Sequence, residues 1–92
     1  MNVNQYLKKK LAVCKRLKKA REDAGYKSAR AFALAHDIFP RIYQRHEVGQ
    51  GDLRLSSIVN YCQLLNRSYL WLIGGLAECE HEPFSDAEIE KL

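Results

Sequence analysis

The sequence predicts an all-α domain with five helices and a short further helix near its C-terminal end. Apolar residues recur at spacings of three and four, as in Leu7, Leu11, Cys14 and Leu17, which is the period of an amphipathic helix. Turn-forming residues separate these segments, and no stretch alternates apolar and polar residues as a half-buried strand would. With 92 residues, 47% of them hydrophobic and 28% charged, the composition suits one folded domain rather than a two-domain enzyme.

The first predicted helix is long and basic. It begins near Asn2 or Asn4, either of which can cap it, and it ends at Ala24 because Gly25 readily adopts the left-handed conformation that follows many helices. Its lysines and arginines allow two interpretations, which the residues alone leave open. They either contact a polyanion or only solvate the exposed face of the helix.

The next two predicted helices are short and are joined by a tight turn. Ser28 is a good N-cap for a helix over residues 29–36. Asp37 tolerates the left-handed region better than most residues, which predicts a sharp turn after this helix. Pro40 suits the first position of the following helix, over residues 40–48.

Two more helices and a short last one follow. A fourth helix is expected to start at Asp52 or Arg54 and to end near residue 65, and a fifth is capped by Ser68 and ends at residue 73. Ser85 and Glu88 have capping-box spacing, which predicts the short last helix. The residues of the third and fourth helices that we expect to face inward are Tyr43, His46, Leu55, Ile58, Val59, Cys62 and Leu65.

Charge is distributed unevenly along the chain. Residues 1–51 contain twelve Lys and Arg against four Asp and Glu, a net charge of +8, whereas residues 52–92 have a net charge of −4. The basic half suits a polyanion such as nucleic acid or an anionic membrane surface. No apolar stretch is longer than residues 69–73, which are far fewer than the roughly 20 residues of a membrane span, and no hydrophobic signal segment follows Met1. We therefore expect a cytoplasmic protein without membrane contact.

The cysteines do not indicate a metal site or a disulfide framework. Cys14, Cys62 and Cys79 are odd in number, widely spaced and without a C-x-x-C pair. No combination of nucleophile, base and acid stands out elsewhere in the chain. We therefore expect no enzyme activity, no cofactor and no bound metal.

Four stretches of the chain share a pattern with a known family. They are RLKKAREDAGY at 16–26, SARAFA at 28–33, YQRHEVG at 43–49 and WLIGG at 71–75. This pattern resembles the Cro/C1-type (XRE) helix-turn-helix family of phage and bacterial repressors over about residues 13–75. The resemblance implies a compact five-helix, lambda-repressor-like helix-turn-helix domain over that range. Residues 1–12 are then a basic extension of the first helix, and residues 76–92 an acidic tail that serves as a dimerisation segment.

The resemblance also implies roles for individual residues. The third helix of this family enters the major groove, which makes Pro40, Arg41, Gln44 and Arg45 the base-reading residues here; Arg pairs well with guanine and Gln with adenine. Phosphate contacts come from the start of the second helix and the loop after the third, which here are Lys27, Ser28, Ala29, Arg30, Gln50, Gly51 and Arg54. The positions of Arg21 and Glu47 imply a buried ion pair with a structural role.

The sequence therefore predicts a sequence-specific DNA-binding transcriptional regulator, a repressor that binds a double-stranded DNA operator as a homodimer. Three residues depart from the family pattern on or near the reading surface. Phe39 stands where Ser or Thr usually caps the third helix, and Pro40 and Ile42 replace polar residues. These departures favour an alternative, a protein-interaction module of antitoxin or adaptor type with weak or no DNA binding.

Overall fold

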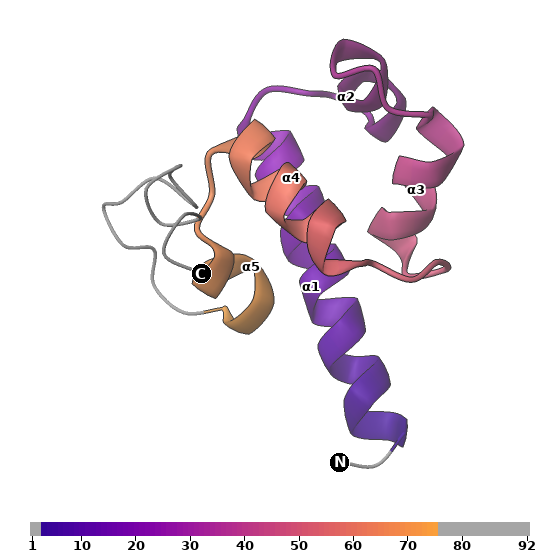
Figure 1. The fold of residues 1–92 in the computed structure, drawn as a ribbon, viewed down its shortest axis with the longest axis vertical. Helices are drawn as coiled ribbons and strands as arrows, with labels where there is room; N and C mark the ends of the chain where they lie inside the picture. Colours follow the sequence, from indigo (N-terminus) through magenta and orange to yellow (C-terminus); the bar gives the residue numbers. More distant parts are fainter. Residues whose placement is uncertain (1–2, 76–92) are drawn as a thin grey trace. The chain divides into compact units, whose positions relative to one another are not determined.

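The computed structural model describes residues 3–75, and this part of the chain is all-α. Its helices are α1 Val3–Asp23, α2 Ala29–Ala35, α3 Pro40–Val48, α4 Leu55–Leu65 and α5 Tyr69–Gly74 (Figure 1). The predicted all-α fold with five helices before residue 76 is confirmed. Of the helices in residues 3–75, none is both long and apolar enough to cross a membrane. The short last helix and the dimerisation segment predicted within residues 76–92 lie outside the described residues.

The chain divides into two compact units. The first unit is Met1–Leu53 and contains α1, α2 and α3, and the second unit is Arg54–Leu92 and contains α4 and α5. The boundary falls within residues 13–75, the range that the resemblance assigns to one DNA-binding domain.

The core of the first unit forms where α2 and α3 pack on each other and on the C-terminal half of α1 (Figure 1). Leu17, Phe32, Ala33 and Tyr43 are fully buried there. The Phe32 ring lies 4.7 Å from the Tyr43 ring and 5.2 Å from the Tyr26 ring, centroid to centroid. Because these rings come from α2, α3 and the loop before α2, aromatic packing fixes the two short helices against each other.

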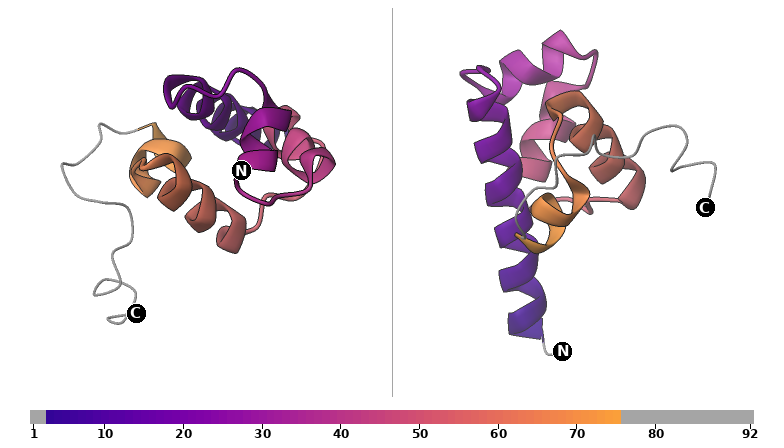
Figure 2. Two further views of the ribbon diagram at one scale, coloured as in Figure 1. Left: turned by 90° about the horizontal axis from the view of Figure 1, so that it is seen from above. Right: turned by 90° about the vertical axis from the view of Figure 1, so that its left-hand side faces the viewer.

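The N-terminal half of α1 extends beyond α2 and α3 (Figure 2). Leu7 and Leu11 belong to the apolar stripe that the sequence predicts, yet both side chains are exposed, whereas Cys14 and Leu17 on the same stripe are buried. The apolar stripe is thus continuous in sequence, but within the first unit only its second half, at Cys14 and Leu17, is buried.

The turn between α2 and α3 has the geometry that its residues favour. Asp37 adopts the left-handed conformation with φ 56°, as the sequence predicts. The N–H of Ile38 donates a 2.8 Å hydrogen bond to the carbonyl of Ala33 and closes the turn. Pro40 then starts α3, and the residue before it, Phe39, is extended and makes no side-chain cap.

The second unit is a helical hairpin. Asn66, in the left-handed conformation, ends α4, and the Ser68 hydroxyl accepts a 3.4 Å hydrogen bond from the Trp71 N–H at the start of α5. The prediction that Leu55 faces inward is wrong, because its side chain is 62% exposed whereas Tyr61 is buried. The buried row of α4 contains Ile58, Tyr61, Cys62 and Leu65, and Leu55 in the first turn lies at the edge of that row.

Candidate nucleic-acid interface

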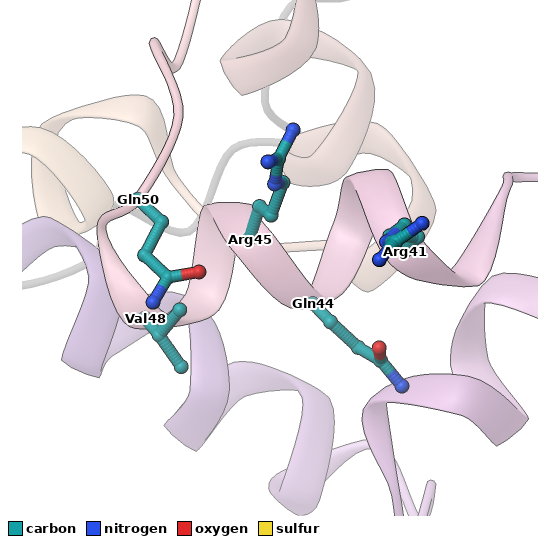
Figure 3. Close-up of a pocket in the computed structure, with 5 residues that line it drawn as sticks. All are labelled: Arg41, Gln44, Arg45, Val48 and Gln50. Carbon is teal, nitrogen blue, oxygen red and sulfur yellow. The ribbon is translucent and has the colours of Figure 1, made fainter.

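The outward face of α3 is mostly polar and carries two cationic side chains. Arg41, Gln44 and Arg45, three of the four predicted base-reading residues, line a surface hollow of about 420 Å³ together with Val48 and Gln50 (Figure 3). All five residues come from α3 and the loop directly after it. The helix and the loop after it therefore bring two guanidinium groups and two carboxamides to one hollow.

The opposite face of α3 is fixed in the core. Tyr43 and His46, three residues apart, are both buried, as the sequence predicts. Burial lowers the pKa of His46, which favours the neutral imidazole at neutral pH. Because these two positions face inward, helical periodicity turns Arg41, Gln44 and Arg45 toward solvent. Pro40 is half-buried at the first position of α3 and does not line the hollow.

Two residues of the hollow have positions that the sequence did not predict. Val48 was not among the predicted site residues, although it follows Gln44 by four residues and Arg45 by three and therefore shares their face. Gln50 was predicted as a phosphate contact but lies beside the residues predicted to read bases, because its N–H donates a 3.0 Å hydrogen bond to the carbonyl of Arg45. Gly49, left-handed with φ 78°, makes this sharp return of the chain possible.

The loop after α3 also packs on α1. A Cβ at Gly49 would lie 3.1 Å from Cδ2 of Leu11, a tight contact, and 3.7 Å from Sγ of Cys14, so glycine is favoured here by its conformation and by the limited space. Burial raises the pKa of the Cys14 thiol, which keeps it protonated and unreactive at neutral pH. Within residues 3–75 no group of three His, Cys, Asp or Glu side chains is arranged to hold a metal ion.

A buried ion pair joins the end of α1 to the end of α3. Nε and Nη2 of Arg21 donate hydrogen bonds of 2.8 and 3.1 Å to the two carboxylate oxygens of Glu47. Nη1 of Arg21 donates a third bond, 2.8 Å long, to the carbonyl of Tyr26. The two side chains are only 5% and 6% exposed, and the hydrogen bond to Glu47 raises the pKa of Arg21. This is the pair that the family resemblance implies, and its geometry fits a structural role.

The predicted phosphate contacts are spread over both units. At the start of α2, Lys27, Ser28 and Arg30 are exposed and Ala29 is half-buried. The Ser28 hydroxyl accepts a 3.0 Å hydrogen bond from the Ala31 N–H, so this side chain is engaged as the helix cap. Gly51 is half-buried beside His46 at the end of α3, and Arg54 is the exposed first residue of the second unit.

A comparison of the chain with protein-family models, with curated proteins and with solved structures gives no match. The relationship to the Cro/C1-type family is therefore a prediction from the four sequence stretches.

Proposed function

We propose that this protein is a sequence-specific DNA-binding transcriptional regulator, a repressor that reads the major groove with α3. The observation that supports this most strongly is the outward face of α3, where Arg41, Gln44 and Arg45 surround one hollow with Gln50. Guanidinium and carboxamide groups are the side chains that best match the acceptor and donor pattern of guanine and adenine in the major groove. The opposite face of the same helix is anchored in the core, which holds these groups on a rigid support.

The part of the chain that contains α3 is basic. Residues 1–51 have a net charge of +8, and the only carboxylate of α3, that of Glu47, is neutralised by Arg21. Lys27 and Arg30 add exposed charge at the start of α2. Contacts of such groups with phosphates position a protein on DNA without reading its sequence.

The proposal extends to the family, the assembly and the location. We assign the chain to the Cro/C1-type family and expect a homodimer that reads two half-sites about 34 Å apart, one turn of the DNA helix. A regulator of this kind acts in the cytoplasm, without a catalytic step, a cofactor or a metal ion.

The test is a selection of bound duplexes from a random DNA pool, followed by affinity measurements on the selected sequence. Arg41→Ala and Arg45→Ala should each weaken binding roughly 5- to 100-fold and relax the preference at one base pair. Lys19→Ala, which removes one positive charge from the exposed surface of α1, is the matched control and should leave the preference at every base pair unchanged. If about five phosphates are contacted, log K should fall against log salt with a slope near −4.5. Affinity that survives both arginine substitutions would refute reading by α3.

A second candidate function is a protein-interaction module with weak or no DNA binding. The observation that favours it is the exposure of two large apolar side chains, Phe39 and Ile42, on the first turn of α3. This candidate predicts no sequence-specific complex with any duplex of the pool at physiological salt.

A further inference from the structure

Two exposed apolar side chains adjoin the cationic face of α3. Phe39 is 76% exposed and Ile42 is 51% exposed. The carbonyl of Phe39 accepts hydrogen bonds of 3.0 and 3.1 Å from the N–H groups of Ile42 and Tyr43, which fixes the backbone of Phe39 at the start of the helix. Because residues three apart are neighbours on a helix surface, Ile42 lies next to Arg45, and Phe39 is the N-cap residue that directly precedes the helix.

The fold does not explain a phenylalanine at position 39. The aromatic cluster of the first unit joins Tyr26, Phe32, His36 and Tyr43, and Phe39 lies outside it. Position 39 is the N-cap of α3, where Ser, Thr, Asp or Asn would accept a hydrogen bond and stabilise the helix, but Phe39 makes no such bond. Phe39 therefore leaves α3 without a side-chain cap and exposes its aromatic ring to solvent. A residue that breaks a local rule in this way is expected where function requires it.

The groups around this apolar pair restrict what it can contact. Arg41 and Arg45 lie on the same helix, and no acidic residue occurs in its first turn. A partner that complements these groups combines negative charge or acceptor atoms with apolar groups at close spacing. The floor of the DNA major groove has this combination, because guanine presents two acceptors there and thymine presents its C5 methyl group.

We propose that Phe39 and Ile42 recognise C5 methyl groups of thymine in the major groove, next to base pairs that Arg41 and Arg45 read. This inference rests on the proposed DNA-binding function and specifies its target further. The bound half-site then contains thymines beside guanines, and part of the sequence preference comes from apolar contact rather than from hydrogen bonds. The apolar residues are in this case part of the reading surface and not a separate docking site for a protein.

The experiment replaces thymine by uracil, which removes only the methyl group. The duplex selected from the random pool is synthesised with each thymine changed to uracil in turn, and the affinity of the 92-residue chain is measured by fluorescence anisotropy at constant salt. Affinity should fall about fourfold for each contacted thymine, the value expected for one buried methyl group. Replacement of thymines outside the footprint is the control on the DNA side.

Protein variants then identify the side chains responsible. Phe39→Ala and Ile42→Ala should each lower the affinity for the thymine duplex and abolish the difference between thymine and uracil at one position. Phe39→Ser should do the same while supplying a helix cap, so a folded variant is available even if Phe39→Ala is destabilised. Leu34→Ala, at an exposed leucine of α2, should keep the full thymine preference.

The possible outcomes separate this inference from the function on which it rests. Equal affinity of the wild type for thymine and uracil duplexes would overturn the methyl contact and leave DNA binding by α3 intact. Variants at Phe39 and Ile42 that bind both duplexes as the wild type does would also overturn it. Failure to form any specific DNA complex would refute the proposed function itself, and the methyl contact with it.

Discussion

Replacement of Arg21 by Met should destabilise the protein strongly. The substitution removes three hydrogen bonds, two to Glu47 and one to the carbonyl of Tyr26, and leaves a carboxylate that is only 6% exposed without its cation. Stranding one member of a buried pair typically costs about 3 to 5 kcal/mol, whereas small domains have only about 5 to 15 kcal/mol of total stability. The loss is measured as the change in free energy of unfolding, from urea titrations followed by circular dichroism at 222 nm.

The double variant Arg21→Met/Glu47→Leu tests whether the unpaired charge of Glu47 causes the loss of stability. It removes both charges, so the remaining cost is mainly the unsatisfied carbonyl of Tyr26, about 1 to 3 kcal/mol. The double variant should therefore be more stable than Arg21→Met alone. Glu47→Gln is an additional variant of nearly the same shape, in which the amide oxygen can still accept one hydrogen bond. It keeps the measurement possible if Arg21→Met does not fold.

A surface pair on α1 provides the matched control. Nζ of Lys19 lies 3.4 Å from the carboxylate of Asp23, four residues later, and both side chains are exposed. Lys19→Ala should cost no more than about 0.5 kcal/mol, because solvent and salt screen such pairs. The reasoning about burial would be refuted if Arg21→Met and Glu47→Leu each cost less than about 1 kcal/mol and their effects simply added in the double variant.

Three further changes test the structure at other points. Burial lowers the pKa of His46 below about 6.5, so the unfolded chain binds the imidazole proton more tightly than the folded chain does. The free energy of unfolding should therefore be highest above about pH 6.5 and decline as the pH falls below that value. Urea titrations between about pH 5 and 7 should show this decline for the wild type and not for His46→Gln. Phe39→Ser should raise the free energy of unfolding by about 0.5 to 2 kcal/mol through a new N-cap, and an unchanged or lower Tm would contradict this. Gly49→Ala should cost more than Gly25→Ala in the same assay, because both positions have positive φ but only at Gly49 would the new Cβ meet a side chain, that of Leu11 at 3.1 Å.

The sequence predicts the helices well because their ends are determined by local chemistry. The Ser28 cap bonds to a backbone N–H three residues later, and the left-handed conformation of Asp37 needs only a short polar side chain. Burial was harder to predict, as Leu55 shows, because periodicity identifies an apolar stripe without saying which neighbours will cover it. The exposed Leu7 and Leu11 have the same explanation, since α1 is longer than the helices that pack on it within the first unit.

The candidate site could be predicted only in part. Arg41, Gln44 and Arg45 were identified because the resemblance places the third helix in the major groove and their functional groups suit base edges, but Val48 has no such group and its place in the hollow follows from helix geometry alone. The Arg21–Glu47 pair joins residues 26 positions apart, and no local rule connects them. Only the resemblance to a family of known fold suggested that pair.

The residues that attach α3 to the rest of the first unit differ from those on its outward face. The helix is held by the burial of Tyr43 and His46, by the ion pair of Glu47 with Arg21, and by the packing of the loop at Gly49 on α1. All these attachments lie on the inward side or at the C-terminal end of the helix, so none of them uses the residues that face outward. The outward positions can therefore change without loss of the fold. An exposed aromatic ring at the helix start, which costs a cap, is tolerated because the inward attachments supply the stability that position 39 does not.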